Sequence, residues 1–181
     1  VKIPSTSNTE MEKNCADYIA EELAKQPYFK VHPDQTGKYL LPEDSLGRSV
    51  PWGLVKGNGG SRKTIILTGH YDVVDTEEYG NERALAYDVE KWENLVKSGN
   101  VLPGMPDEVK EDFLSGDWMF GRGTADMKGG LSVGLVLLDW YGKIVAEAEG
   151  KARSVAVSEA EVASELGDAS GISGNLLFVT A

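Results

Sequence analysis

The sequence predicts an α/β fold, a three-layer sandwich built around a mostly parallel or mixed central sheet. Two observations predict it. Apolar, β-branched runs at residues 64–68 and 175–180 are typical of buried strands, and two segments with helical periodicity, residues 11–23 and 127–148, alternate with them. The 181 residues, of which 41% are hydrophobic and 26% charged, suffice for one globular domain with a core.

The first predicted element is an amphipathic helix. Ser7 and Glu10 have the spacing of a capping box, in which the serine oxygen accepts a hydrogen bond from a free backbone N–H. Apolar side chains then recur at every fourth position (Met11, Cys15, Ile19 and Leu23), and Pro27 ends the helix. Residues 28–31 are predicted as a short strand, and residues 32–49 as a loop or a broken hairpin.

Two strands are predicted next. Residues 50–56 form a strand that Pro51 places at a sheet edge or at a strand start. The glycine-rich residues 57–60 form a turn, and the continuous apolar run at residues 64–68 predicts a strand buried on both faces.

The segment 76–116 is polar and irregular, and it contains helical patches at residues 88–96 and 107–114. Segments of this length usually carry small helices of their own or serve as lids. Residues 117–120 are a further strand candidate.

The helix predicted at residues 127–148 has little polar face, so we expect it to be largely buried. Residues 149–174 are small, acidic and rich in Gly and Ser, which predicts a loop. Residues 175–180 form the last predicted strand, also buried.

Composition limits the classes of partner. The net charge of −11 argues against nucleic-acid binding, which requires a basic face; it suits cationic partners or metal ions, and equally plain solubility. Cys15 is the single cysteine, which excludes an internal disulfide and a thiolate zinc cluster. We find neither an apolar run of about 18 residues nor a signal-peptide pattern, so we expect a cytoplasmic protein without a membrane partner.

His70 and Asp72 follow the predicted strand at residues 64–68. In extended backbone their spacing places both side chains on one face. They lie just past the end of a buried strand, where α/β folds place their sites. An imidazole can bind a metal ion through one nitrogen, and a nearby carboxylate can orient that imidazole.

Asp126 lies in a second polar cluster, residues 121–130, at the head of the predicted helix. Taken alone, an aspartate in this glycine-framed turn reads as a helix cap, which contributes about 1 kcal/mol. The two clusters together, Gly-His-x-Asp after a strand and Gly-Arg-Gly-x-x-Asp-x-Lys-Gly-Gly before a helix, resemble the co-catalytic zinc exopeptidase and deacylase family. Its members include aminoacylase, glutamate carboxypeptidase, acetylornithine deacetylase and succinyl-diaminopimelate desuccinylase. The flanking residues 70–80 and 117–123 are most similar to the arginine-utilisation (RocB-type) branch.

The resemblance implies a role for each residue. His70 matches a zinc ligand, Asp126 matches the aspartate that bridges two zinc ions, and Asp72 matches the catalytic-site aspartate that supports the metal site and the base. In the family the peptide bond after the bridging aspartate is often cis, so the bond from Asp126 to Met127 is a candidate. Two cations about 3.5–4 Å apart repel each other, which explains the bridging carboxylate.

The implied function is hydrolysis of amide bonds in small peptides or N-acyl amino acids by a water that two Zn²⁺ ions activate, with Co²⁺ or Mn²⁺ as alternative metals. In the family a Glu-Glu pair, which supplies the base and a ligand, follows the strand that residues 176–180 match. We therefore expect residues 1–181 to be the N-terminal portion of the catalytic domain and to be inactive alone. The family's smaller domain, which commonly mediates homodimer formation, is expected elsewhere in the whole protein.

His32 and Arg122 are two further residue types that can serve in such a site. His32 is expected to be a surface residue and not a substitute ligand, and Arg122 a local salt-bridge residue and not a carboxylate binder. The alternative function is that of a non-catalytic fragment or relative, in which a vestigial metal site serves binding or assembly.

Overall fold

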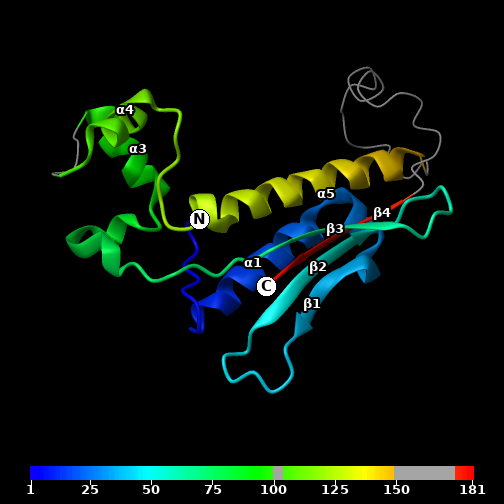
Figure 1. The fold of residues 1–181 in the computed structure, drawn as a ribbon. Coiled ribbons are helices and arrows are strands. Elements are labelled where there is room, and N and C mark those ends of the chain that lie inside the picture. The colour runs from blue at the N-terminus through cyan, green and yellow to red at the C-terminus, as the bar shows by residue number, and fades with distance from the viewer. Residues whose placement is uncertain (100–103, 149–173) are drawn as a thin grey trace.

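A mixed four-stranded sheet forms the centre of the fold, with strand order β1-β2-β4-β3 (Figure 1). The structure is a computed structural model that describes residues 1–99, 104–148 and 174–181. The strands are β1 (Thr36–Leu40), β2 (Ser49–Val55), β3 (Thr64–Gly69) and β4 (Asn175–Thr180). β2 is antiparallel to both β1 and β4, and β3 is parallel to β4. The predicted α/β class with a mixed sheet is confirmed.

Three helices pack on one face of this sheet: α1 (Met11–Lys25), α2 (Pro27–Val31) and α5 (Gly129–Ala148) (Figure 1). Gly53 shows how closely they meet it. A Cβ atom at Gly53 would lie 2.8, 3.1 and 3.2 Å from side-chain atoms of Phe29, Leu138 and Leu23, one from each helix. The main hydrophobic core therefore lies between these helices and β2, β4 and β3.

The opposite face of the sheet is open. Leu54, Leu177 and Ile66 lie side by side across three strands there, and Ile66 is 59% exposed. Within the described ranges no second helical layer covers this face, so the third layer of the predicted sandwich is not seen. The prediction that β3 is buried on both faces is wrong, because Ile65 and Ile66, on opposite faces of the strand, are 68% and 59% exposed. Among the described strands β3 pairs with β4 alone and is an edge.

α5 is buried on one side only, whereas a largely buried helix was expected. Leu131, Leu138 and Val145 are buried against the sheet, whereas Val133 and Val136 are 60% and 67% exposed. The helical stretch Thr124–Ala148 is long and apolar enough to cross a membrane by length and composition alone, which is weak evidence because core helices of soluble proteins pass the same test.

Two local predictions in the first 60 residues are wrong, and one pair of alternatives is decided. The capping box does not form, since α1 has Glu10 as its N-cap and no side-chain cap bond. Residues 28–31 belong to α2 and not to a strand, with Pro27 at the first helical position, which proline favours. β2 is an interior strand and not an edge, but Pro51 lies near its start, as the other alternative predicted, and the ladder with β4 begins only at Trp52.

Residues 77–99 and 104–120 form a lobe beside the sheet (Figure 1). It contains a 3-10 segment (Glu77–Leu85), α3 (Val89–Ser98) and α4 (Asp107–Ser115), so both predicted helical patches are confirmed. Residues 117–120 have no regular secondary structure, so the predicted strand there is wrong. The lobe has a hydrophobic cluster of its own, centred on Leu85, Trp92 and Phe113. The loop predicted at residues 149–174 lies almost wholly outside the described residues.

Candidate metal centre

His70 is placed at the end of the sheet by the pairing of β3 with β4. The parallel ladder continues one step past both strands, because Ala181 N donates to Gly69 O at 3.1 Å and Tyr71 N donates to Ala181 O at 2.9 Å. Tyr71 is buried and its hydroxyl donates to Ser49 O at 2.9 Å. The backbone on both sides of His70 is therefore held, and its side chain projects from the rim of the sheet.

The imidazole of His70 lies between two aspartates. Its Nδ1 is 3.1 Å from the backbone oxygen of Asp72 and 3.0 Å from Oδ1 of the same residue. Its Nε2 is 3.0 Å from Oδ1 of Asp126. In the neutral tautomer that keeps its proton on Nδ1, directed at the Asp72 carbonyl, Nε2 carries the lone pair that a metal ion needs. The structure thus brings together all three predicted site residues.

Asp126 reaches His70 because of an unusual start to α5. A single π-helical turn (Thr124–Lys128) precedes the helix, and the Asp126–Met127 peptide bond inside it is cis, as predicted. Gly69 allows the head of α5 to approach the end of β3, since a Cβ atom there would lie 2.7 Å from Met127 Cε. The carboxylate of Asp126 is 85% exposed, which leaves the centre open to solvent on that side.

The charges around His70 favour its protonated form. Burial lowers the pKa of His70, but the Asp72 carbonyl and the carboxylates of Asp72 and Asp126 outweigh burial and raise the pKa above the ordinary value of 6.5. A proton on Nε2 then bridges to Asp126. The same space between two acceptor atoms suits a divalent cation, which competes with that proton.

The donor set fits part of a zinc shell. Imidazole nitrogen and carboxylate oxygen are both ordinary zinc ligands, and catalytic zinc takes three protein ligands. Among the residues that the structure describes, no group of three or more His, Cys, Asp or Glu side chains could hold a metal ion. His70 and Asp126 are therefore two donors of an incomplete centre, and their role as ligands stays a prediction.

Two residues near this centre were not predicted as site members. Ser7 Oγ donates to Asp72 Oδ2 at 2.5 Å, from a serine that the sequence pattern assigned to a helix cap. Lys128 is buried, and its Nζ donates to Ile3 O at 2.6 Å. Burial lowers the pKa of Lys128. No sequence pattern indicates either contact, because the partners are more than 60 residues apart.

Arg122 and His32 lie outside the group formed by His70, Asp72 and Asp126. Arg122 forms an ion pair with Glu78 at 3.0 Å and lies over the ring of Tyr79, as expected of a salt-bridge residue. His32 ends α2, is half-buried, and packs its ring 4.5 Å from that of Tyr28.

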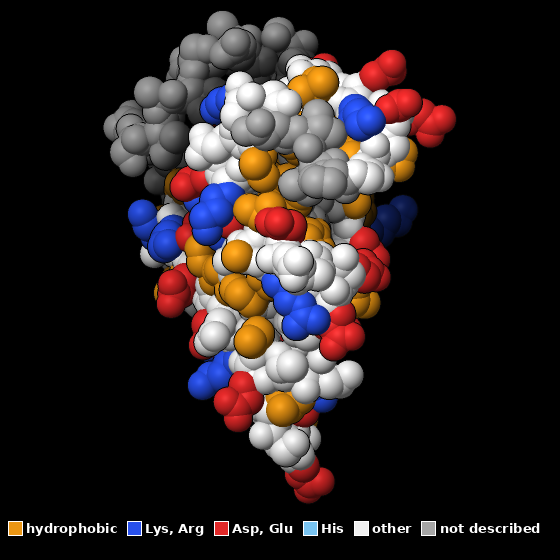
Figure 2. Space-filling view, turned by 90° about the vertical axis from the view of Figure 1, so that its left-hand side faces the viewer, with side chains coloured by type: hydrophobic (Ala, Val, Ile, Leu, Met, Phe, Trp, Pro, Cys, Tyr) orange, Lys and Arg blue, Asp and Glu red, His pale blue; other side chains and the backbone are white. Residues whose placement is uncertain are grey.

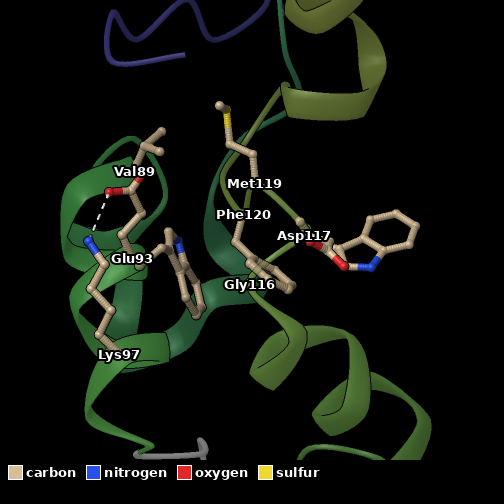
Figure 3. A pocket seen from close by; sticks show the side chains of 9 residues that line it. Val89, Glu93, Lys97, Gly116, Asp117, Met119 and Phe120 are labelled. Atoms are coloured by element: carbon tan, nitrogen blue, oxygen red, sulfur yellow. Dashed lines mark ion pairs between the residues drawn. The ribbon is translucent and has the colours of Figure 1, made fainter.

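A separate cavity of about 420 Å³ opens on the lobe and contains none of the three site residues. In Figure 3, Glu93 and Lys97 form an ion pair on one wall, with Met119, Phe120 and Asp117 across from them. Trp118 and Met119, which also line it, are 60% and 61% exposed. Figure 2, viewed from the lobe side, shows hydrophobic side chains interspersed with charged ones. This cavity lacks the paired histidine and carboxylate of the metal centre, and we do not assign the chemistry to it.

The chain is a partial homologue of two proteins of Bacillus subtilis (strain 168). It is 34% identical to the protein RocB over 138 residues and 39% identical to the protein YqjN over 140 residues. These alignments cover 76% and 77% of this chain but 24% of each relative. The predicted resemblance to the RocB-type branch is thereby confirmed.

Comparison with solved structures finds an M20 family metallo-carboxypeptidase, Sso-CP2 from Sulfolobus solfataricus. The match covers 99% of this chain and 28% of that chain, with 17% sequence identity and a TM-score of 0.48. No family model matches the chain.

Proposed function

We propose that the whole protein to which this homologue of RocB and YqjN belongs is a metal-dependent hydrolase of amide bonds in small peptides or N-acyl amino acids. The observation that carries the proposal is the 3.0 Å approach of His70 Nε2 to Asp126 Oδ1, at the rim of the sheet. These two acceptor atoms come from separate motifs, one after β3 and one before α5, and both motifs match the zinc exopeptidase pattern.

The chain's own residues have distinct tasks in this proposal. His70 and Asp126 would hold the metal ions, with Zn²⁺ first and Co²⁺ or Mn²⁺ as alternatives. Asp72 keeps the Nδ1 side of His70 occupied, through its backbone oxygen at 3.1 Å and its carboxylate at 3.0 Å, so that Nε2 faces Asp126. A bound pair of divalent cations supplies polarisation of the substrate carbonyl and a lowered pKa of water.

The sheet also indicates where the remaining groups would come from. Ala181 hydrogen-bonds with Gly69 and Tyr71, on either side of His70. Chain that continues from β4 would therefore pass directly beside the imidazole. We propose that this position supplies the general base in the whole protein, as the Glu-Glu pair does in the family pattern.

The chain spans 24% of the length of the relatives it matches. We propose that in the whole protein further helices cover the open face of the sheet around Ile66, which completes a three-layer sandwich. Homodimer formation through a separate domain and a cytoplasmic location complete the proposal. Hydrogen exchange tests the covering layer: β3 amides should be protected in the whole protein and exchange faster in residues 1–181 expressed alone.

The activity is tested on the whole protein, stripped of metal with a chelator and reloaded with Zn²⁺, Co²⁺ or Mn²⁺. Release of free amine from a panel of N-acyl amino acids and dipeptides is the measurement. We expect turnover only after reloading, and a loss of at least about 100-fold in kcat/KM for His70→Ala and Asp126→Asn, because each removes a donor atom.

His32→Ala is the matched control, since it removes the other histidine of the chain at a half-buried position outside the centre. It should retain activity within about twofold once folding is confirmed by thermal denaturation. Equal activity of the His70→Ala and parent proteins would exclude the proposed centre.

The non-catalytic alternative is favoured by one observation, the lack of a three-donor group within the described residues. If it holds, the whole protein binds a metal ion weakly and hydrolyses none of the panel. Metal content of the purified whole protein separates the two, because a two-metal hydrolase should retain close to two ions per chain and a vestigial site one or fewer.

A further inference from the structure

The N-terminal residues 3–7 run alongside the segment that follows β3, and we call them the strap. Thr6 forms a parallel bridge with Val73. Ser7 N donates to Val73 O at 2.9 Å, and Val73 N donates to Ser5 O at 2.9 Å. The strap therefore adds a short strand-like pairing to the backbone that carries Asp72.

The strap bonds to both elements that carry the site residues. Ser5, its middle residue, is fully buried, and its Oγ donates to Tyr71 O at 2.6 Å, next to His70. Ile3 O, at the N-terminal end of the strap, accepts the bond from Lys128 in the turn that holds Asp126. One strand end and one helix head are thus connected through the same five residues.

Ser7 makes the contact of the strap with a predicted site side chain. Its Oγ donates to Asp72 Oδ2 at 2.5 Å, a short distance typical of a hydroxyl bound to an ionised carboxylate. The other oxygen, Oδ1, is left facing His70 Nδ1 at 3.0 Å. With one oxygen held, the carboxylate has a defined orientation toward the imidazole.

A helix-capping role does not explain this side chain. α1 begins four residues later, at Met11, and Ser7 Oγ bonds only within the segment after β3, to Asp72 Oδ2 and at 3.2 Å to Val73 O. Other side chains near the start of α1 accept hydrogen bonds from backbone N–H groups there: Asn8 N donates to Glu12 Oε1, and Met11 N donates to Thr9 Oγ1.

We propose that Ser7 is a positioning residue of the metal centre: its hydroxyl holds the Asp72 carboxylate against Nδ1 of His70, so that Nε2 is presented toward Asp126. The catalytic consequence rests on the proposed function, but the effect on metal binding does not. Groups that orient a ligand from outside the coordination shell typically change metal affinity by about 10–100-fold. Because Ser7 acts through Asp72, its removal should reach the lower end, about tenfold.

The test uses the whole protein and measures Zn²⁺ affinity by competition with a chromophoric chelator. Ser7→Ala should bind Zn²⁺ about tenfold more weakly than the parent protein. Thr9→Ala is the matched control, a neighbouring hydroxyl that bonds to Thr6 O and Met11 N without contacting Asp72. It should bind Zn²⁺ as the parent does.

The pair Ser7→Thr and Ser7→Val separates the hydroxyl from the shape of the side chain. The threonine variant should restore the affinity and the visible spectrum of the Co²⁺-loaded protein, and the valine variant should not. Should Ser7→Ala fail to fold, this pair still decides, since its members share branching at Cβ and differ in the hydroxyl.

A double-mutant cycle tests whether Ser7 acts on Zn²⁺ binding through Asp72. Asp72→Asn should weaken Zn²⁺ binding, and adding Ser7→Ala to it should cost little more, because the two residues act as one unit. Additive losses, or an unchanged affinity in Ser7→Ala and Ser7→Val, would overturn the proposal. If the whole protein hydrolyses no amide and the affinities still follow this pattern, the proposed function fails and the role of Ser7 stands.

Discussion

His70 is the residue on which the centre depends, and its charge state should control metal binding. Its pKa is raised by Asp72 and Asp126, so below that pKa a proton occupies the position a metal ion needs. We predict that Zn²⁺ binding releases more protons from His70 at about pH 6.5 than at about pH 8.5. Titration calorimetry in two buffers of different ionisation enthalpy measures this release.

A rise in pH has opposite effects on metal binding and on the stability of the metal-free fold: it favours metal binding and lowers the contribution of His70 to stability. A folded-state pKa above the unfolded value means that the ion pairs of His70 stabilise the metal-free fold below pH 6.5, and that this contribution is lost as the pH rises through the folded-state pKa.

Two variants serve as controls for the proton release on Zn²⁺ binding. His32→Ala should leave the release unchanged, and His70→Ala should abolish the proton that His70 contributes. A binding enthalpy independent of buffer at the lower pH would contradict the assignment.

Tyr71 is a second residue for which the surroundings allow a prediction, here of the free energy of unfolding. It is 1% exposed, its hydroxyl bonds to Ser49 O, and burial, with the charge of Glu12, raises its pKa to about 12. Tyr71→Phe leaves the buried Ser49 carbonyl without this donor, so the free energy of unfolding should fall by about 1–3 kcal/mol. Tyr39→Phe, on an exposed side chain, should change it by less than about 0.5 kcal/mol in urea denaturation.

At the scale of elements, the start of α5 decides where Asp126 lies. Gly129 follows the π-helical turn, and a Cβ atom there would lie 2.3 Å from the backbone oxygen of Thr124. Gly129→Ala must therefore shift the turn that carries Asp126. We expect a loss of about 1–3 kcal/mol in the free energy of unfolding, together with weaker Zn²⁺ binding.

Gly130 provides the matched control in the same helical turn. Its Cβ atom would meet only the flexible end of Met127, at 3.3 Å. Gly130→Ala should be neutral or stabilising by up to about 1 kcal/mol, because alanine favours helix more than glycine does. Similar losses in the two variants would show that the approach to Thr124 is not what requires a glycine.

At the scale of the whole molecule, the described residues form two separate hydrophobic clusters, one under the sheet and one in the lobe. Trp92 packs against Phe113 and Phe120 in the lobe, with ring centroids 6.2 and 5.8 Å away. We predict that Trp92→Ala speeds amide exchange in α3 and α4 and leaves β2 and β4 protected, because the lobe can open locally.

Leu138→Ala should instead speed amide exchange in the sheet, since this fully buried side chain belongs to the cluster under the sheet. It should lower the protection of β2 and β4, at a cost of about 2–5 kcal/mol in the free energy of unfolding. Exchange mass spectrometry compares both variants, and equal loosening of sheet and lobe by Trp92→Ala would show a single cooperative unit.

Much of the local structure could be predicted from the sequence. α1, α3, α4 and α5 follow from periodicity, and β2, β3 and β4 from apolar runs. These features depend on residues within a few positions of each other. Residues 28–31 show the limit, because a short apolar segment after a proline suits a strand or one helical turn, and packing of Tyr28 and Phe29 into the core selected the turn.

The sequence by itself determined the two motifs of the metal centre, since His70, Asp72 and Asp126 are recognisable by spacing, glycines and position after a strand or before a helix. Only the tertiary structure decided that β4 lies between β2 and β3, that β3 is an edge, and that Ser7 holds Asp72 and does not cap α1. The physical reason is distance along the chain. A cap, a turn or a stripe is a contact between near neighbours. The pairings of β4 with β2 and β3 join residues more than 100 positions apart, and the Ser7–Asp72 bond joins residues 65 positions apart, which no local pattern records.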